Sequence, residues 1–545
     1  MRHKFRDADG VGDGATVRHR LADPVYRRQN IVLHRDDNRL TTSGGTPLNF
    51  LHVVEGGTGT TGTFENPYGS ISNAMLNPLS ATGYVYTPSG GTFTENVTMT
   101  AGSRLFSNGP TQFVSTNVGS VQLPFSGASS SLTELPSTIV GDVTLANNTV
   151  LNGFDVQGSV TGTTVMNSSL INNRIESFAG DAISLTASND VSMNNLLIVN
   201  PAQRGILLND SSASLSSVTI QNSGNTALEI NTTADNRTVT ATGLNITGGL
   251  SGIDAKVTGT GNLLLNISGT PGSATASNFI SVQQDAVSVL TVAGSTGDAT
   301  VQLSSLTVSS SAGSGIVVVG SAGIGDGTTT VTGFSGNSVT KAATGGVLFD
   351  TVTFDSNMTT LGIQPVSAGT LTVGAVPVDV TGAGVSIQNS TGDLNLGVAR
   401  IFNNNGPGLY VATSPNLTVS STTGSTMETQ SGPVLDLSNT KTTLNFTSLS
   451  SKNSPGANHG IHLDNITGTI YTTTTTNIVD SVAPAAILIE NIPFSTQNSL
   501  VPQFGALTIN SLFKATEATL ISLPGNNTGI VQPIYTPSLT IVFPP

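Results

Sequence analysis

The stretch INNRIESFAGDAISL, residues 171–185, places two short apolar segments on either side of a turn made of small residues. Variants of this phrase recur along the chain, and Ile175, Ile198, Ile220 and Ile246 align in one column at a spacing of roughly 22–26 residues. Such steps are too long to join neighbours on one helix or hairpin. They are typical of stacked repeats, none of which can bury its apolar face alone.

A second column follows the first at a nearly constant offset, so the segment between them is one fixed structural unit. A further column appears in the C-terminal half, at a spacing of roughly 25–27 residues. The apolar segments are short, alternating and β-branched, and no helix-length pattern lies between them. These two columns are Ile183, Ile206, Leu228 and Ile253, and then Leu409, Val434, Ile461 and Ile487.

The repeat predicts an all-β fold, a single-stranded right-handed parallel β-helix over residues 111–545 with a C-terminal cap. Each coil, or rung, would hold three short strands and three turns, with Asn and Gly at the bends because both tolerate positive φ. Like residues would stack on like, so that apolar columns fill the interior and Asn side chains form ladders at the turns. The stretch 255–380 is less regular, and its rungs cannot be assigned from the pattern.

The composition supports this class and narrows the chemistry. Charged residues are 9% of the 545, against about 25% in ordinary globular proteins. No apolar run reaches the roughly 18 residues that a membrane-spanning helix needs. The chain has no cysteine, which excludes a disulfide framework and a thiolate metal site.

The charge is unevenly distributed. Residues 1–40 carry nine Lys and Arg against six Asp, a balance of +3, so the remainder has 10 basic and 26 acidic residues, a balance of −16. An acidic body poor in lysine argues against nucleic acid as the partner, because phosphate binding needs clustered cations. No apolar signal-peptide core follows Met1.

The segment 46–110 is expected to cap the first rung and begin the stack. Within HVVEGGTGTTGTFENPYGSISNAM (52–75), Asn66 can cap a short helix that begins at Pro67 and ends near Met75. Ile71, Ala74 and Met75 would then face the rod from a short N-terminal capping helix. Residues 84–110 are expected to form the first rungs, with Pro88 and the following glycines at a corner.

Two stretches carry a resemblance to known families. GTFENPYGSISNA (62–74) and VYTPSGGTFTENVTMTAGSRL (85–105) are similar to the start of the β-helix in secreted bacterial proteins with pectate-lyase-like folds. RLADPVYRRQNIVLHR (20–35) resembles the segment that joins an outer-membrane β-barrel to its exported β-helix in inverse-autotransporter-like proteins. That resemblance implies that the basic segment 1–45 is the remnant of a barrel; an ordinary disordered tail is the alternative.

One constellation is a candidate catalytic site. Asp155 precedes Val156 as Arg174 precedes Ile175, which places Asp155, Arg174 and Glu176 on one face of consecutive rungs. The favoured interpretation is a surface ion pair worth about 0–1 kcal/mol. Asp350 and Asp355 could likewise share a strand neighbourhood, and are expected to be ordinary solvent-facing residues.

Other motifs predict no cofactor and no metal. His459 and His462 are three positions apart, which on a strand places them on opposite faces, so a shared metal ion is not expected. The segment NHGIH (458–462) only partly resembles the Gly-His-Gly signature of polygalacturonase-like enzymes. The glycine-rich GSAGIGDG (320–327) lacks the Lys-Ser/Thr of a phosphate-binding loop and is expected to be a turn. The sole Asp-Asp pair, Asp36–Asp37, lies outside the rod.

The favoured function is therefore a non-catalytic, surface-exposed or secreted bacterial β-helix, an adhesin-like passenger or rigid stalk whose partners are glycans or neighbouring cell surfaces. The alternative is a carbohydrate-active enzyme, a polysaccharide lyase or glycoside hydrolase on the same scaffold, with carboxylates assembled from several rungs. Glycoside hydrolysis needs two carboxylates about 5–10 Å apart.

Overall fold

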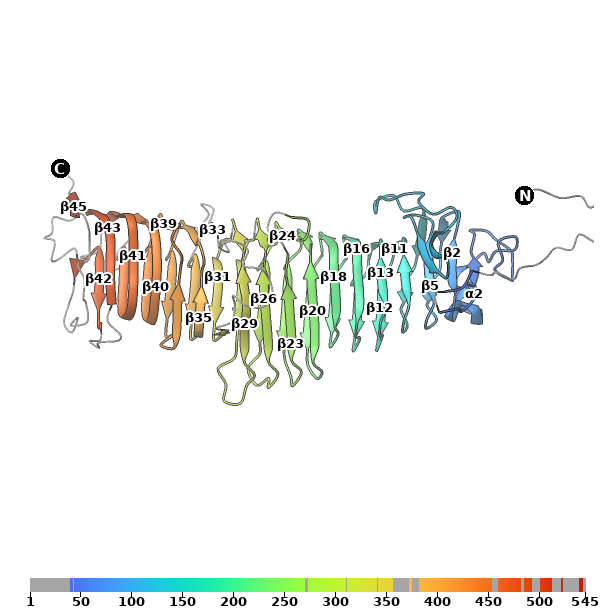
Figure 1. The fold of residues 1–545 in the computed structure, drawn as a ribbon, viewed down its shortest axis with the longest axis horizontal. Coiled ribbons are helices and arrows are strands. Elements are labelled where there is room, and N and C mark those ends of the chain that lie inside the picture. The colour runs from blue at the N-terminus through green and yellow to red at the C-terminus, as the bar shows by residue number, and fades with distance from the viewer. Residues whose placement is uncertain are drawn as a thin grey trace, which may run out of the picture.

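The chain winds into one long right-handed parallel β-helix in the computed structural model (Figure 1). The rod runs from the N-terminal cap at one end, drawn in blue, to the C-terminal rungs at the other, drawn in red. Most of the predicted basic segment, with residues 20–35 and the Asp36–Asp37 pair, lies outside the described residues. The structure describes residues 40–42, 44–269, 273–309, 311–340, 342–355, 372–374, 382–452, 459–481, 485–492, 500–511, 521–522 and 539–542.

Each rung contributes one strand to each of three parallel ladders, named here sheets 1, 2 and 3 in chain order. Several long strands bend through a corner and serve two or three sheets. Sheet 1 contains β1 (Phe50–His52), β2 (Tyr84–Thr87), β5 (Arg104–Ser107), β10 (Val150–Asn152), β13 (Ser169–Ile171), β16 (Val191–Val199), β18 (Ala213–Gln221), β20 (Arg237–Thr242), β23 (Leu263–Ile267), β26 (Ala299–Ser304), β29 (Thr329–Ser335), β32 (Thr353–Phe354), β35 (Thr391–Asn395), β38 (Leu417–Ser420), β40 (Leu435–Lys452), β41 (Ile461–Ser481) and β43 (Leu500–Ser511).

Sheet 2 follows sheet 1 after a tight corner. It contains the C-terminal parts of β16, β18, β40, β41 and β43 together with β3 (Gly91–Phe93), β8 (Ser137–Val140), β11 (Asp155–Gln157), β14 (Arg174–Glu176), β21 (Asn245–Thr247), β24 (Ser277–Ile280), β27 (Leu306–Val308), β30 (Ser338–Val339), β33 (Thr372–Gly374), β36 (Arg400–Asn403), β39 (Ser425–Thr429) and β45 (Leu539–Val542).

Sheet 3 completes each rung. It contains the first parts of β40 and β41 together with β4 (Val97–Thr98), β9 (Val143–Thr144), β12 (Val160–Thr163), β15 (Ile183–Thr186), β17 (Ile206–Asn209), β19 (Leu228–Thr232), β22 (Ile253–Val257), β25 (Val287–Thr291), β28 (Ser314–Val319), β31 (Gly345–Asp350), β34 (Val385–Gln388), β37 (Leu409–Ala412), β42 (Ile487–Glu490) and β44 (Ile521–Ser522).

The predicted apolar columns are confirmed in the sheet register. Ile175 pairs with Ile198, which pairs with Ile220 and then Ile246, and all four are buried. The column that starts at Ile183 is paired in the same way. Together with the inward residues of sheet 1 they form one continuous hydrophobic core along the rod, because equivalent side chains stack at the inter-strand spacing of about 4.8 Å.

One position of the C-terminal column was predicted wrongly. Leu409 pairs with Leu435 and not with Val434, so the column is Leu409, Leu435, Ile461 and Ile487, and its members are evenly spaced along the chain. Val434 is also buried, as are Ala182, Ala227 and Ala486 at the same position of other rungs. Because Val434 and Leu435 are adjacent and both buried, the apolar pattern could not decide which of them aligns with Leu409.

The irregular stretch 255–380 is regular in its strands and variable in its corners. Ile253, Val287, Ile316, Val347 and Val385 pair in succession, although the chain length between one partner and the next changes from rung to rung. The extra length is shared between two corners. The loops before β23, β26 and β29, between sheets 3 and 1, extend from the lower edge of the rod (Figure 1). The connections from β23 to β24 and from β32 to β33, between sheets 1 and 2, are also long. Larger corners therefore hid the periodicity.

In many rungs the corner between sheets 1 and 2 is tight and is built around one left-handed residue. Asn172 and Asn195 have φ values of 54° and 51°, and Gly153 occupies the same place one rung earlier with 86°. The Asn195 amide donates to Asn172 Oδ1 at 2.8 Å, and Asn172 donates to Asn152 Oδ1 at 3.2 Å. The predicted Asn ladder is confirmed at this corner.

The N-terminal cap contains the short helix α2 (Ile71–Met75), followed by the 3-10 turn η1 (Pro78–Ala81). Ile71, Ala74 and Met75 are buried, as predicted, but the helix begins later than predicted. Ser70 is its N-cap, because Asn66 and the residues after it instead form a loop that pairs through Tyr68 with Val53. Glu95 supports the cap by accepting hydrogen bonds from the Ile71 and Ser72 amides at 2.7 and 3.0 Å.

Candidate functional site

The predicted ion-pair constellation lies on the outer face of sheet 2. Asp155 on β11 is the register partner of Arg174 on β14. The Arg174 guanidinium binds Asp155 Oδ1 at 2.7 Å and Glu176 Oε2 at 2.6 Å, and the three side chains are 15–19% exposed. One cation therefore holds both carboxylates, and an acid–base pair would first have to release it.

A second ion-pair group continues onto sheet 3 and was not predicted. Arg204 binds Asp181 at 2.9 Å and Glu229 at 3.2 Å, from the rungs before and after its own. Glu229 is the register partner of Asp254, which binds Lys256 at 2.6 Å. Asp181 and Arg204 each stand two residues before the paired Ile183 and Ile206, so the alignment that placed Arg174 could have found this contact. Glu229 is the register partner of Leu207, and the alignment does not relate it to Arg204.

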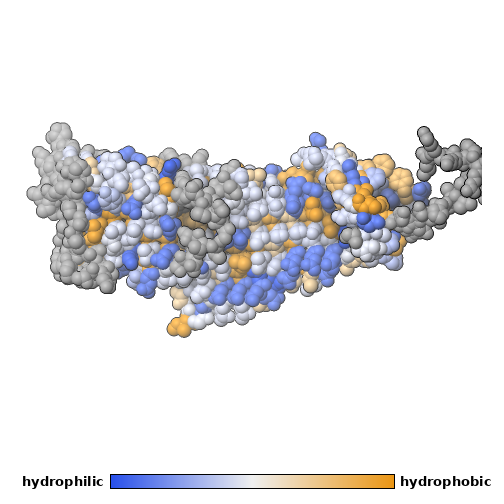
Figure 2. Space-filling model, viewed as in Figure 1, coloured by the Kyte–Doolittle hydropathy of each residue, from blue (hydrophilic) through white to orange (hydrophobic). Residues whose placement is uncertain are grey.

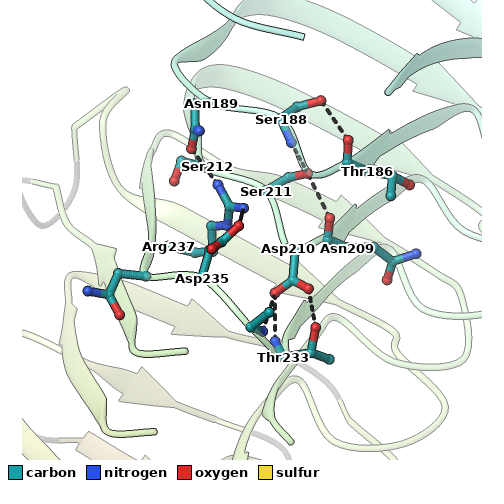
Figure 3. Close-up of polar contacts among 12 residues, drawn as sticks. Thr186, Ser188, Asn189, Asn209, Asp210, Ser211, Ser212, Thr233, Asp235 and Arg237 are labelled. Atoms are coloured by element: carbon teal, nitrogen blue, oxygen red, sulfur yellow. Dashed lines mark hydrogen bonds and ion pairs between the residues drawn. The ribbon is translucent and has the colours of Figure 1, made fainter. Parts of the chain in front are cut away.

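Hydrogen bonds hold the corner between sheets 3 and 1 at the rung where its loops begin to lengthen (Figure 3). Asp210 accepts hydrogen bonds from the Thr233 hydroxyl and from the amides of Thr233 and Ala234, the amides at 2.6 and 3.1 Å. Partial burial opposes ionisation, but these hydrogen bonds, with the charge of Arg237, outweigh it and lower the pKa of Asp210. The carboxylate thus fixes the first enlarged corner.

Arg237 fills the base of the same corner. It is 4% exposed, and its guanidinium donates to Asn189 Oδ1 at 2.6 Å and to Asp235 Oδ2 at 2.5 Å. Figure 3 shows these contacts beside a column in which Ser211 Oγ accepts from the Ser188 amide. Arg237 reaches past the rung of β18 to Asn189, and the other contacts join neighbouring rungs or close one loop, so this corner is explained as structure.

The histidine pair lies on the outer face near the C-terminal end. The His462 ring contacts Asp436 at 2.9 Å and Glu490 at 3.2 Å, one rung before and one rung after. The hydrogen bond to Asp436 raises the pKa of His462, and the hydrogen bond to Glu490 adds to this effect. Partial burial acts in the opposite direction but is outweighed. His459 was predicted on the opposite face, and this is wrong: the two ring centroids are 5.8 Å apart, because His459 precedes the strand and is not bound by its alternation.

The remaining predicted positions are corner residues. Asp350 Oδ1 accepts from the Asn389 amide at 2.9 Å, as part of a ladder at the end of sheet 3, and Asp355 follows β32. Residues 320–327 form the loop before β29, where the Asp326 carboxylate accepts hydrogen bonds from the Gly294 amide at 3.1 Å and from the Ser321 hydroxyl. Across the described ranges, no three His, Cys, Asp or Glu side chains are grouped so that they could hold a metal ion.

An aromatic cluster on the outer face of sheet 1 at the N-terminal end was missed. Tyr84, Tyr86 and Phe106 pack there under an insertion that carries the antiparallel hairpin β6 (Phe113–Thr116) and β7 (Gly119–Gln122). The Phe50 and Tyr84 rings stack at 5.0 Å, and Tyr84 meets Phe106 edge-on at 5.3 Å. Burial raises the pKa of Tyr86 to about 12.

Two phenyl rings at the border of this cluster remain in solvent. Phe64 and Phe125 are 55% and 65% exposed, and their rings stack with centroids 6.0 Å apart and planes 8° apart. His52 meets Phe64 edge-on at 5.5 Å, and partial burial lowers the pKa of its imidazole. Figure 2 shows hydrophobic residues gathered over this end of the rod. The aromatic platform, defined as Phe64 and Phe125, joins two distant segments of the chain that no periodicity relates.

Sheet 1 presents a polar outer face along most of the rod. Its outward positions on successive strands are largely hydroxyl and amide side chains, with Leu264 among them. Figure 2 shows a hydrophilic band along the lower edge of the middle rungs, where sheets 3 and 1 meet. The outward residues include Ser192, Asn194, Ser214, Ser216, Thr238, Thr240, Thr300, Thr330, Thr418, Ser420, Thr443, Thr467 and Thr469.

No described helix has the length and the apolar character that crossing a membrane requires.

Comparisons with known proteins show similarity in structure alone. No family model matches the chain, and no curated protein matches it in sequence. One similar solved structure is PfbA, a surface adhesin of Streptococcus pneumoniae, with a TM-score of 0.32 and 11% identity over 70% of this chain and 86% of that one. Another is the GH136 lacto-N-biosidase from Eubacterium ramulus, with a TM-score of 0.29 and 10% identity over 68% of this chain and 64% of that one.

Proposed function

We propose that the protein is a non-catalytic, extracellular binding rod that attaches to glycans in the manner of an adhesin. The observation that carries the proposal is the outer face of sheet 1. Its hydroxyl and amide groups both donate and accept hydrogen bonds, and they recur at the inter-strand spacing of about 4.8 Å along the rod. Such a face matches the hydroxyl groups of an extended sugar chain.

The charge of the body supports a neutral ligand. Residues 41–545 carry a balance of −16, from 10 basic and 26 acidic residues. Several of the cations on the outer faces, among them Arg174, Arg204 and Lys256, are bound to carboxylates. An anionic polysaccharide would meet a repulsive field with few free cations, so the proposal commits to uncharged glycans.

A carbohydrate-active enzyme stays the second candidate because of the charged groups on sheets 2 and 3. Asp155, Glu176, Asp181 and Glu229 lie on neighbouring rungs beside two arginines. Carboxylates in such a row could serve as acid and base if a substrate displaced the cations. The geometry favours binding, since each of these carboxylates is occupied by a guanidinium.

One experiment separates the two functions. The protein is incubated with neutral polysaccharides and with pectin and related uronans, and both retention on the polysaccharide and release of reducing ends are measured. We expect retention on a neutral polysaccharide and no released product. If the wild type releases reducing ends and Asp155→Ala does not, the protein is a carbohydrate-active enzyme and the binding proposal is wrong.

We also infer a bacterial cell-surface location, with attachment to an outer-membrane barrel. Support comes from the resemblance of residues 20–35 to the segment that joins barrel and passenger in inverse-autotransporter-like proteins. Protease added to intact cells of the source organism should then degrade the protein. Full protection on intact cells, with degradation after lysis, would contradict this location.

A further inference from the structure

We propose that the aromatic platform, Phe64 with Phe125, is the anchoring subsite for a neutral pyranose ring. This inference rests on the proposed glycan-binding function and names the place where that function is concentrated. The observations are the two exposed, parallel phenyl rings, the turns that present them, and the chemistry of the groups beside them.

Both rings are presented by tight turns. Phe64 is a central residue of the turn in which Thr63 and Asn66 pair, closed by the hydrogen bond from the Asn66 amide to the Thr63 carbonyl at 3.1 Å. Phe125 is the third residue of a turn closed by the hydrogen bond from the Ser126 amide to the Leu123 carbonyl at 3.2 Å. The rings therefore stand at two turn tips on separate loops.

The backbone at Phe125 is held in a conformation that suits glycine. Its φ is 66°, and it follows a proline, so it stands where a type II turn normally carries glycine. A bulky residue with positive φ is an outlier, and such outliers collect at functional sites. A phenyl ring at this position is costly for the fold and is left in solvent, which points to a use in binding.

The surroundings hold the Phe125 turn rigidly in place. The buried Tyr86 donates from Oη to the Pro124 carbonyl at 2.6 Å. The Leu123 amide donates to the Gln112 carbonyl at 2.8 Å, and the Gly127 amide donates to the Asn108 carbonyl at 3.1 Å. Because the turn is fixed before a ligand arrives, binding does not have to order it.

The groups beside the rings fit a sugar. Aromatic faces pack against the C–H face of a pyranose, and Thr61, Thr63 and Gln122 supply exposed hydroxyl and amide groups nearby in the sequence of the two turns. Glu65 is the other central residue of the Phe64 turn and adds negative charge. An anionic sugar is therefore disfavoured at the platform itself, in agreement with the acidic body.

The size of the platform argues against a protein partner. A stable protein interface buries about 800 Å² on each side, whereas the two rings stand on two turn tips. A second copy of the chain docking through these rings would be detected as a change in oligomeric state. A single sugar ring packed on the exposed face of a phenyl group needs far less area.

The test compares variants of the full chain by affinity electrophoresis. The gels contain a neutral polysaccharide on which the wild-type protein is retained. Phe125→Gly removes the ring and relieves the positive-φ conformation, so it should fold at least as well as the wild type. We expect Phe125→Gly and Phe64→Ala each to weaken binding about tenfold, while Phe64→Tyr keeps it. The matched control is Phe178→Ala, which removes a phenyl ring that is 69% exposed on the turn between β14 and β15.

The possible results distinguish failure of the sugar subsite at the aromatic platform from failure of the proposed glycan-binding function. If the wild type is retained and both ring variants bind as tightly as Phe178→Ala, the platform is wrong and glycan binding by another face stands. If the wild type binds neither neutral nor charged polysaccharide, the proposed function and the platform both fail. If sedimentation shows a wild-type dimer that the ring variants lose, the rings serve self-association and the sugar subsite is wrong.

Discussion

Removing Arg174 should disturb the rod more than removing a cation from a solvent-exposed ion pair. Its two partners are less than a fifth exposed, so truncation leaves two partly buried carboxylates without their cation. We expect Arg174→Ala to lower the free energy of unfolding by about 1–3 kcal/mol, the range for leaving a buried hydrogen-bonding group without its partner. Chemical denaturation measures it.

The control for that variant is Lys452→Ala. Lys452 pairs with Glu428 at 3.0 Å, but the two side chains are 39% and 40% exposed. A solvent-exposed pair contributes about 0–1 kcal/mol, so this variant should change stability little. Equal losses in the two variants would contradict the argument from exposure.

His462 should make the C-terminal rungs more stable at acidic pH. Its pKa is raised in the folded state by Asp436 and Glu490, so folding favours the protonated ring. That stabilisation is complete below the unfolded value of about 6.5 and is lost as the pH rises through the folded pKa. We expect hydrogen exchange in β41 and β42 to be slower at pH 5.5 than at pH 8.5 once intrinsic rates are corrected.

His462→Gln should remove this pH dependence. Other titratable groups near His462 are His459, Asp464 and Tyr410. His52→Gln is the opposing control, because burial lowers the pKa of His52 and its stabilisation is lost as the pH falls. A dependence that survives in His462→Gln would assign it to another group.

At the scale of the element, the tight corner between sheets 1 and 2 depends on a left-handed residue and its side-chain ladder. Asn195 has φ 51° and donates to Asn172. We expect Asn195→Ala to cost about 1–2 kcal/mol, because alanine tolerates the left-handed conformation less well than asparagine and the ladder is lost. Asn195→Gly also loses the ladder but adopts the conformation at no steric cost, so thermal unfolding should show the smaller loss for Gly; the reverse order would contradict the argument from the left-handed backbone.

The strands were predictable from the sequence because a parallel stack repeats its chemistry at every rung. Ile175 and Ile198 could be aligned since both stand in the same inward position, and Arg174 followed from its neighbour. The corners were not predictable, because a loop can lengthen without changing the register on either side of it. The long step from Ile253 to Val287 is such a case.

The candidate sites divide in the same way. The Asp155–Arg174 contact lies between register partners and could be read from the repeat. The pairing of Phe64 with Phe125 joins a loop of the cap to an insertion between β5 and β8, and neither segment belongs to the repeat. The capping helix was placed too early because Asn66 followed by Pro67 mimics a helix start, whereas Ser70 has the N-cap geometry.

At the scale of the whole molecule, a destabilising substitution in the middle of the rod should reduce stability only in the rungs near it. Each rung contacts mainly its neighbours, so stability is close to a sum of rung and interface terms. Ile198→Asp would bury a charge in the core of β16. We expect hydrogen exchange to accelerate in β14, β16 and β18 while β37 to β41 keep their protection; a uniform loss along the rod would show a single cooperative unit.

The even spacing of Leu409, Leu435, Ile461 and Ile487 along the chain has a genetic consequence. An in-frame duplication or loss of one such step returns every inward and outward position to its former role. The molecule then grows or shrinks by about 4.8 Å, the spacing between paired strands, with its faces unchanged. Reach can thus be adjusted by recombination between similar coding segments, without redesign of either tip.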